Sequence, residues 1–460
     1  MVSKVIILGA GITGLSLAWK LSSQGVEVCV FESNDVIGGL SGTLREDGYC
    51  MDVGPHWFYS NDTEIRETVL GLFDRELKSA SRHVKLYYKG RFIEYPFTAY
   101  GAFVQMGILS GILAGLSYLR SNISSLKRRP LEDEEETLED WAIQNFGKHL
   151  YYTFFKPYTE QFWKIPCAEL SSDVIPSHTR LNFINKFHKS LCRHLDKIDL
   201  SRIEREVLHT YYPNSGFSEI AERIADEARK AGSCIYTKCT VIGVDELSDG
   251  RVRVHYEFNG GQREMNGDYV VSTIPPNQFI KMLNPLAPDE ILDSADKLDT
   301  LSLVVLGMVT EKQNILKHSA VYVLKGLYNR ISEMNKFNPT TSPPGENILV
   351  VEMPCMKNSA VWKASKEELF DMCIGGLAEM GFLDRKDVKR LLLIRAQNAY
   401  SFYHKDYAAN LRRLINHING RKNMAILGRT GEFVYMDVDM CIRKAFDFAG
   451  HLINQFKREP

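Results

Sequence analysis

The sequence predicts an α/β protein that contains a parallel sheet, and three observations support this fold class. The chain has 460 residues, which is too long for a single hydrophobic core and suits two interleaved domains. Residues 4–8 and 26–32 are short, apolar and rich in β-branched side chains, as buried strands are. Residues 12–23, between them, space their apolar side chains as a helix does. A strand, a helix and a second strand at this spacing form a βαβ unit, in which the two strands are parallel.

The glycine-rich turn of this unit predicts a dinucleotide-binding fold. Gly9, Gly11 and Gly14 form the pattern Gly-x-Gly-x-x-Gly between the first strand and the helix. The first glycine allows a tight turn, the second lets the backbone approach a pyrophosphate, and the third lets the helix pack closely on the strand. The helix N-terminus favours the anion, and Glu32, which ends the next strand, can accept the ribose hydroxyls. We therefore expect a Rossmann-type domain at the N-terminus.

A second glycine pair follows Glu32 and favours FAD over NAD. The chain continues to Gly38, Gly39, Leu40 and Ser41. This box resembles that of the glutathione-reductase-like flavoprotein superfamily, and the resemblance extends from residue 1 to about residue 52. It implies bound FAD, with the backbone of these four residues beside the pyrophosphate and the ribityl chain. An ordinary turn is the alternative.

The rest of the chain alternates between helical and strand-like segments. Helices are expected at 138–155 and 218–231, strands with two tight turns at 235–271, and a last helix from about residue 439. We expect a discontinuous FAD-binding domain made of residues 1–85, 215–275 and 420–460. A helix-rich substrate domain would then occupy residues 86–214, and a mixed, substrate-binding sheet residues 276–419.

The composition favours a small-molecule substrate. Lys and Arg total 56 and Asp and Glu 57, a formal net charge of -1, so no global positive charge attracts nucleic acid. The nine cysteines include no Cys-x-x-Cys pair and no zinc spacing, so we expect free thiols and no metal. The N-terminal apolar run is a strand rather than a signal peptide, and we expect a cytoplasmic protein.

Residues 99–119 are apolar enough on paper to span a bilayer. Gly101, Gly107, Gly111 and Gly115 interrupt the stretch, and it lies between segments that belong to one enzyme. We expect a buried helix, or one in weak contact with a membrane surface, rather than a transmembrane span.

A histidine motif places the chain near one group of flavoproteins. Gly54, Pro55, His56 and Phe58 form a Gly-Pro-His-x-Phe segment that resembles UDP-galactopyranose mutases. Amine-oxidase-like and protoporphyrinogen-oxidase-like flavoproteins carry a similar Gly-Gly-His-x-Phe. The resemblance implies that Gly54, Pro55 and His56 contact the cofactor and that His56 lies close to the isoalloxazine ring. A satisfied core histidine is the alternative.

Three later segments resemble the same mutases. They are Tyr158-Thr-Glu-Gln-Phe-Trp163, Asn329-Arg330-Ile-Ser-Glu333 and the stretch from Gly428 to Asp439. The resemblance implies that the substrate-binding residues are Tyr158, Trp163, Arg330, Tyr400, Tyr403 and Tyr435. It implies that further cofactor contacts come from Val241, Arg429, Asp437 and Asp439.

Arg330 and Tyr435 would bind a diphosphate, and with His56 they form the predicted catalytic group. Arginine suits this role because its planar fork donates two parallel charge-assisted bonds to phosphate oxygens. A surface salt bridge is the alternative for Arg330. Two departures from the family pattern stand out. Phe433 replaces a tyrosine, and the mobile-loop arginine falls near Ser177, where Arg180 and His178 are the nearest cations.

Two enzymatic functions follow from the resemblance. The first is a sugar-nucleotide mutase, an isomerase of polysaccharide biosynthesis that interconverts pyranose and furanose rings with the reduced flavin as nucleophile. NAD(P)H would be an external reductant. The alternative is an oxidoreductase of the amine-oxidase or protoporphyrinogen-oxidase-like type, and a flavin-binding scaffold without catalysis is a third hypothesis. We favour the mutase, with a nucleoside-diphosphate sugar as substrate, and a homodimer stays open.

Overall fold

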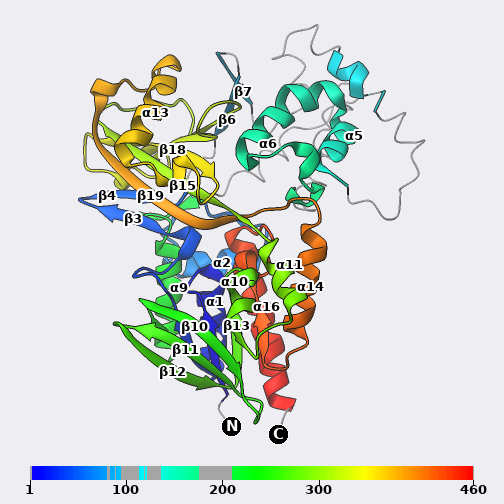
Figure 1. Ribbon diagram of the computed structural model, residues 1–460. Coiled ribbons are helices and arrows are strands. Elements are labelled where there is room, and N and C mark those ends of the chain that lie inside the picture. Colours follow the sequence, from blue (N-terminus) through cyan, green and yellow to red (C-terminus); the bar gives the residue numbers. More distant parts are fainter. Residues whose placement is uncertain are drawn as a thin grey trace.

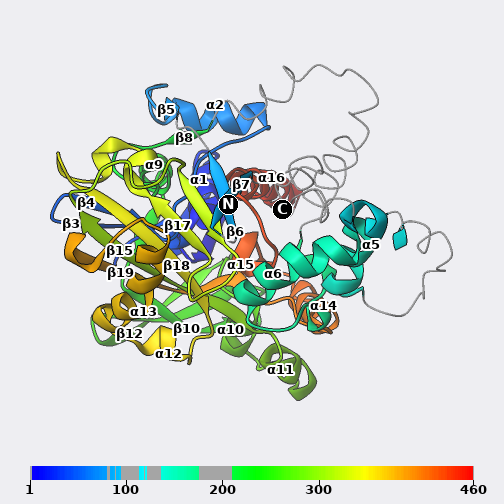
Figure 2. The same cartoon turned by 90° about the horizontal axis from the view of Figure 1, so that it is seen from above.

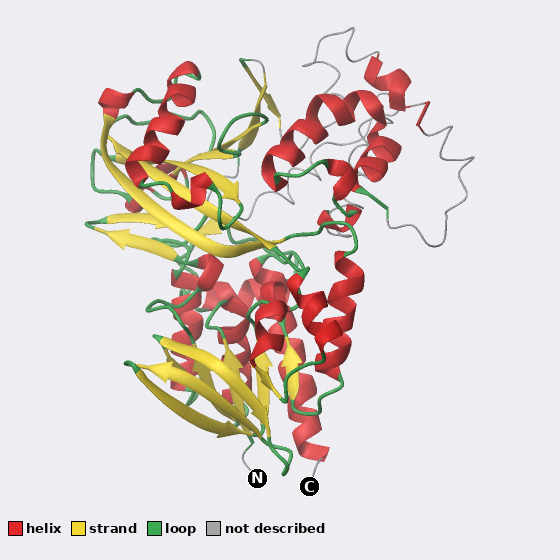
Figure 3. Ribbon diagram, viewed as in Figure 1, coloured by secondary structure: helices red, strands yellow, loops and turns green. Residues whose placement is uncertain are grey.

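The computed structural model describes residues 3–79, 83–88, 90–94, 113–118, 120–121, 136–175 and 210–458. These residues form a lower part that contains both chain ends and an upper part made of a large sheet and a group of helices (Figure 1). The same elements are seen from above in Figure 2 and by type in Figure 3.

A five-stranded parallel sheet is the centre of the lower part. Its strand order is β20-β13-β1-β2-β9, and every neighbouring pair is parallel. The strands are β1 (Lys4–Leu8), β2 (Glu27–Phe31), β9 (Cys234–Tyr236), β13 (Tyr269–Ser272) and β20 (Met424–Ile426). The central strands are almost entirely buried because helices cover one face and a second sheet lies near the other. Segments distant in sequence thus build one sheet, which confirms the predicted α/β fold class.

Three helices pack together on the parallel sheet. They are α1 (Ile12–Ser22), α9 (Glu219–Lys230) and α16 (Val438–Arg458), and α1 contacts both of the others. α9 turns one apolar face inward, with Ile220, Ala221, Ile224, Ala225 and Ala228 all buried.

A four-stranded sheet accompanies the opposite face of the parallel sheet. It has the order β12-β11-β10-β14 and consists of β10 (Cys239–Glu246), β11 (Val252–Phe258), β12 (Gly261–Gly267) and β14 (Leu283–Asn284). Phe31 of β2 contacts Tyr256 of β11, with ring centroids 4.5 Å apart. Apolar contacts therefore join the two sheets.

A seven-stranded sheet dominates the upper part. Its order is β19-β15-β18-β17-β16-β6-β7. The strands are β6 (Val84–Tyr88), β7 (Arg91–Glu94), β15 (Thr300–Thr310), β16 (Ala320–Val323), β17 (Arg330–Glu333), β18 (Asn347–Cys355) and β19 (Val388–Ser401). α13 (Lys366–Glu379) begins with a capping box between Ser365 and Glu368 and packs on this sheet.

The helices of the upper region are interrupted by a kink at Gly147 and by a π-helix. α5 (Leu138–Leu150) is followed by a π-helix (Tyr151–Phe155) and α6 (Lys156–Trp163). Gly147 has φ 80, and a Cβ there would lie 2.8 Å from the backbone of Ser117 and Tyr118. The helix expected at 138–155 therefore exists, but it is kinked at Gly147, where another segment packs directly on its backbone, and its last turn is underwound into a π-helix.

Smaller elements connect these parts. They are β3 (Thr43–Glu46), β4 (Tyr49–Asp52), α2 (Thr63–Gly71), β5 (Lys78–Ser79), β8 (Tyr211–Tyr212), α10 (Pro276–Phe279), α11 (Asp289–Asp296), α12 (Ala360–Lys363), α14 (Tyr407–Asn419) and α15 (Gly428–Gly431).

The strand pairings indicate where the first FAD-binding segment ends. Residue 85, the expected end of the first FAD-binding segment, lies inside β6, which pairs with β16 of the upper sheet. We therefore propose that this segment ends before β6. Of residues 99–119 only 113–118 are described, and these are helical; the rest of that predicted segment lies outside the described residues. Among the described helices, none is both long and apolar enough to cross a membrane.

Candidate active site

The glycine-rich turn forms a backbone cradle at the carboxyl end of β1. A Cβ at Gly14 would lie 2.1 Å from the carbonyl oxygen of Gly9, so only glycine lets α1 pack this closely. A Cβ at Gly11 would have no atom within 4 Å, which leaves open space in front of the helix. No side chain caps the N-terminus of α1, so its free N–H groups face that space. This arrangement suits a phosphate group.

Glu32 lies beside the cradle at the end of β2. Its side chain is 7% exposed. One carboxylate oxygen accepts the N–H of Ala10 at 2.9 Å, and the other accepts the N–H of Asn34 at 2.9 Å. The oxygen that accepts the Asn34 N–H also accepts Asn34 Nδ2 at 2.6 Å. The oxygen bonded to the Ala10 N–H keeps a second lone pair, which can accept a ribose hydroxyl. Val241, the predicted contact on β10, is 8% exposed within an apolar cluster.

The second glycine pair lies against the first. Gly38 and Gly39 have φ 106 and φ 55, a left-handed backbone that other residues rarely adopt. The Gly38 N–H donates to the carbonyl of Ala10 at 2.8 Å, and Gly38 forms a parallel bridge with Gly11. Leu40 and Ser41 follow in a short 3-10 turn. The two glycine motifs therefore form one continuous cradle.

A buried carboxylate supports the loop that carries His56. Asp52 is completely buried and accepts hydrogen bonds from Thr43 Oγ1 at 2.7 Å, Tyr212 Oη at 2.7 Å and the Phe217 N–H at 3.0 Å. Burial raises the pKa of Asp52 to about 6, although these donors oppose the shift. Asp52 thus joins β3, β4 and residues 212–217 next to His56.

His56 is a neutral imidazole at the junction of cradle and pocket. Its ring stacks on Phe217 with centroids 5.4 Å apart. Burial, together with the positive charges of Arg330 and Arg429, lowers the pKa of His56 to about 3. Its Nδ1 is buried and has no hydrogen-bond partner within the described part of the chain. A buried polar atom of this kind suits contact with a polar group of a bound cofactor.

Arg429 closes the cradle from the C-terminal segment. It follows Gly428, whose φ is 83 and where a Cβ would lie 2.4 Å from Thr13 Oγ1. The guanidinium donates to the carbonyls of Met436 at 3.3 Å and Ala399 at 3.2 Å. No carboxylate among the described residues lies within salt-bridge distance of it, so its positive charge is available to a ligand. These features together fit FAD: two glycine turns, a buried acidic residue, a buried histidine and an arginine on one side of the sheet.

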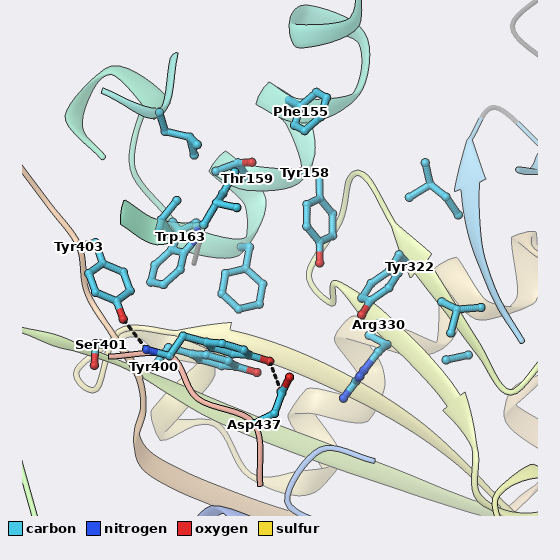
Figure 4. Close-up of a pocket in the computed structure, with 18 of the residues that line it drawn as sticks. Phe155, Tyr158, Thr159, Trp163, Tyr322, Arg330, Tyr400, Ser401, Tyr403 and Asp437 are labelled. Carbon is cyan, nitrogen blue, oxygen red and sulfur yellow. Dashed lines mark hydrogen bonds between the residues drawn. The ribbon is translucent and has the colours of Figure 1, made fainter. Parts of the chain in front are cut away.

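A pocket of about 530 Å³ adjoins the cradle. One wall consists of Phe155, at the end of the π-helix, and Tyr158, Thr159 and Trp163 of α6 (Figure 4). Phe162 of α6 also lines it, and together these side chains recur at helical spacing. The facing wall carries polar side chains from both chain halves, namely His56, Tyr59, Tyr322, Arg330, Tyr400, Ser401, Tyr403, Arg429, Tyr435 and Asp437. The structure therefore brings most of the predicted substrate residues together.

Arg330 is held by a partner that the sequence analysis missed. Its Nε and Nη2 lie 2.5 Å and 2.8 Å from the two carboxylate oxygens of Glu352, which is 2% exposed. Nη2 also donates to the carbonyl of Pro55 at 3.1 Å. Gly54 makes room for the pair, because a Cβ there would lie 3.0 Å from Glu352 Oε2. Most of the donor fork of Arg330 is thus already engaged. A signal existed in the sequence, since Glu352 is the one charged residue in an otherwise apolar run, 348–355.

The predicted tyrosines have different surroundings. Tyr403 accepts the backbone N–H of Tyr435 at 2.9 Å, so its hydroxyl fixes the C-terminal segment. Tyr435 donates to Asp437 at 3.3 Å, and Tyr59 donates to the same carboxylate at 3.0 Å. Burial raises the pKa of Tyr435 to about 12, which keeps the phenol protonated. Trp163 contacts Tyr400 edge to face, with centroids 6.4 Å apart.

The remaining positions discussed from the sequence belong to the final motif and to the mobile loop. Phe433, which stands where the resembled family has a tyrosine, is 1% exposed with φ 58 and packs against Tyr403 and Tyr407. Asp439 accepts Ser60 Oγ at 2.7 Å and ties the start of α16 to the loop after His56. Ser177, His178 and Arg180 lie outside the described residues.

Fold and site together define a dinucleotide-binding flavoprotein with a substrate pocket next to its cofactor cradle. The chain belongs to the family of flavin containing amine oxidoreductases, whose sequence pattern matches residues 12–402. This membership implies a flavin cofactor.

Two solved structures share the fold over nearly the whole chain. One is reduced UDP-galactopyranose mutase, 20% identical with a TM-score of 0.78, covering 99% of this chain and 94% of that one. The other is a putative protoporphyrinogen oxidase from Exiguobacterium sp. 255-15, 16% identical with a TM-score of 0.77, covering 99% of both chains. At these identities the likeness establishes the fold alone.

A curated relative matches this chain over a short segment only. The chain is 46% identical over 52 residues to 4,4'-diapophytoene desaturase (4,4'-diaponeurosporene-forming) of Staphylococcus aureus (strain COL). The match spans 11% of this chain and only 10% of the desaturase. Its small extent carries no reaction to this chain.

Proposed function

We propose that this protein is a FAD-dependent sugar-nucleotide mutase that interconverts the pyranose and furanose forms of a nucleoside-diphosphate hexose. The observation that supports this most is the position of Arg429. Its guanidinium has no carboxylate partner among the described residues, lies 4.4 Å from the ring centroid of Tyr435, and lines an aromatic pocket beside the cofactor cradle. A cation between aromatic faces suits a ligand that carries both phosphate and flat or sugar-ring surfaces.

The roles of the two arginines differ in this proposal. Arg429 donates to the diphosphate, because its present acceptors are only neutral carbonyl oxygens. Arg330 is a secondary contact, since Glu352 and Pro55 occupy two of its nitrogens. The diphosphate anchor therefore shifts from Arg330 toward Arg429 relative to the expectation from sequence.

The remaining pocket residues position the sugar and exclude water. Tyr158 and Trp163 cover it from α6, and Tyr435 with Asp437 offers a hydroxyl and a carboxylate at its edge. His56, neutral and buried, contacts the cofactor side. When bound and reduced, FAD supplies a nucleophile for the anomeric carbon in such a reaction. Holding that carbon in place through the remote diphosphate is what this chain contributes.

An oxidoreductase acting on an apolar substrate is the second candidate. The upper lining of the pocket favours it, because Leu138, Trp141, Phe154, Val174 and Ile175 carry no charge. In that case oxidised flavin would accept a hydride, and the apolar wall would hold the substrate body.

Anaerobic assays separate the two candidates. The reduced holoenzyme is incubated with a panel of nucleoside-diphosphate hexoses, and ring isomers are separated by chromatography. The mutase proposal expects isomerisation only after reduction and with no oxidant consumed. Bleaching of the oxidised flavin by an apolar donor, with no isomerisation of any sugar nucleotide, would overturn it.

Arg429→Met tests the diphosphate contact directly. Losing one charge-assisted contact should weaken nucleotide-sugar binding by about 1.5–3 kcal/mol, roughly 10- to 150-fold. Arg385→Met is the matched control, because that arginine pairs with Asp371 on the surface. Since Arg429 also borders the cradle, flavin content is measured in parallel. Unchanged binding in flavin-loaded Arg429→Met would contradict the assignment.

The partner and reductant follow from this proposal. A nucleoside-diphosphate sugar is the expected ligand, and NAD(P)H is a candidate external reductant for the flavin. A cytoplasmic location, a homodimer and a weak membrane contact through residues 99–119 stay predictions from the sequence.

A further inference from the structure

Two cysteines face each other on neighbouring strands of the parallel sheet, away from the pocket. Cys29 on β2 and Cys234 on β9 are register partners, as are Phe31 and Tyr236 two residues later. Residues two apart in a strand share a face. The rings of Phe31 and Tyr236 stack with centroids 5.4 Å apart, which shows that side chains of the two strands meet on this face. The thiols of Cys29 and Cys234 lie in the same row.

The spacing of the two strands matches that of a disulfide. Neighbouring strands lie about 4.7–4.9 Å apart, and the Cα atoms joined by a disulfide are usually about 4.4–6.8 Å apart. Both cysteines are free thiols in the structure. A bond between them therefore requires only side-chain adjustment and a small movement of β9, which is an edge strand.

The two thiols differ in access to solvent. Cys29 is 3% exposed, whereas Cys234 is exposed at the edge of the sheet. Burial raises the pKa of Cys29 to about 11, while the Lys4 ammonium acts against that shift. An oxidant therefore reaches Cys234 first, and Cys29 is placed to react with the product.

We propose that Cys29 and Cys234 are a modification site that forms a reversible disulfide with hydrogen peroxide as oxidant. The Cys234 thiolate attacks one peroxide oxygen, the O–O bond breaks, and a sulfenic acid forms; the leaving hydroxide takes up the proton that the thiol lost and departs as water. The Cys29 sulfur, after losing its proton, attacks the Cys234 sulfur and releases a second water. Two thiols are oxidised by two electrons, and one hydrogen peroxide is reduced to two waters.

The site lies next to a residue of the cofactor cradle. Tyr236, two residues after Cys234, accepts the Glu32 N–H at 2.8 Å, and the Cys239 N–H donates to the Glu32 carbonyl at 2.8 Å. A disulfide would join β9 covalently to β2 beside this contact. We expect slower flavin loss and a higher unfolding temperature in the oxidised form, because the bond closes a long loop of chain.

To test this, the purified holoprotein is treated with hydrogen peroxide and the remaining thiols are alkylated. The protein is then digested without reduction, and its peptides are identified by mass spectrometry. The expected product is one cross-linked peptide pair that contains Cys29 and Cys234 and disappears with dithiothreitol. Cys234→Ser should abolish the cross-link and the rise in unfolding temperature. Cys50→Ser is the matched control, because Cys50 is also partly accessible but has Arg45 as its register partner; it should change neither.

Two results would overturn the proposal. One is oxidation of Cys234 to a sulfinic acid, or its pairing with any other thiol, while Cys29 stays reduced. The other is a peroxide-induced rise in unfolding temperature that persists in Cys234→Ser. Because Cys234 is exposed, this variant is expected to fold, and the test does not depend on a substitution at buried Cys29.

Discussion

The cofactor cradle and the substrate pocket meet at His56, yet they are built from different atoms. Backbone groups and glycines form the cradle, where Gly14 and Gly428 bring main chains and side chains closer than any Cβ allows. Charged and aromatic side chains form the pocket, where Arg330, Arg429 and Trp163 come from distant segments and Glu352 pairs with Arg330. The cradle should therefore be damaged most by added atoms, and the pocket by removed charges and hydrogen bonds.

The largest effect is expected from Gly14→Ala. The new Cβ would lie 2.1 Å from the Gly9 carbonyl oxygen, so α1 would have to move from β1. Overpacking usually costs about 1–3 kcal/mol when side chains can shift. Here the clash is with backbone that cannot shift without moving the helix, so we expect a larger cost that prevents folding. We expect little folded, flavin-loaded protein, measured by flavin absorbance and thermal unfolding.

Gly11→Ala separates the effect on cofactor binding from the effect on folding. Its Cβ would meet no protein atom within 4 Å, and the backbone there is extended at φ -78. The variant should fold with nearly normal stability but retain little flavin, because the methyl group fills the space proposed for the pyrophosphate. Full flavin content in Gly11→Ala would show that the pyrophosphate does not lie there.

Glu352→Gln should be next in size. It leaves the buried Arg330 guanidinium without its counter-charge, and breaking a buried pair costs about 3–5 kcal/mol. Urea unfolding measures the loss. Asp371→Asn breaks the exposed pair with Arg385, with an expected cost of about 0–1 kcal/mol. Equal losses of unfolding free energy in the two variants would contradict the prediction, because they would show that the Arg330–Glu352 pair contributes no more than a surface pair.

Asp52 predicts a dependence of stability on pH. Because burial raises its pKa from 3.8 to about 6, the folded state binds the proton more tightly than the unfolded state. Its contribution is fully present below about pH 4 and is lost as the pH rises through about 6, by about 1.4 kcal/mol per pH unit within this window. The stability of the wild type relative to Asp52→Asn should fall accordingly in urea titrations. A flat difference between pH 4 and pH 6 would contradict the raised pKa.

The smallest effect is expected from Tyr403→Phe. The substitution removes the acceptor of the Tyr435 N–H and keeps the ring, at a cost of about 1–3 kcal/mol if that N–H stays buried. Because Tyr435 lines the pocket, substrate KM should rise with little change in flavin content. Tyr407→Phe serves as control, since its hydroxyl donates to Asp173 instead. A similar KM change in both variants would indicate general loosening of the aromatic cluster.

The βαβ unit, both glycine boxes and the position of Glu32 could be predicted from the amino-acid sequence. These features depend on residues close together in the chain, and their backbone conformations follow from glycine's lack of a Cβ. The sequence also named most residues of the pocket, including Tyr158, Trp163 and Tyr435, because short motifs resemble those of known flavoproteins.

The contacts between these residues could not be predicted and became visible only in the folded chain. Arg330 and Glu352 are register partners on β17 and β18, and neither local pattern nor motif specifies that register. Asp52 is a buried acceptor because Tyr212 and Phe217, which are 160 and 165 residues away in the sequence, fold back against it. Phe433 was known from the sequence only as a replacement for a tyrosine of the resembled motif, and its burial in the core with a left-handed backbone became visible only in the fold. Motifs specify which groups are present, whereas pairing, burial and charge balance arise from long-range contacts and so appear only in the folded chain.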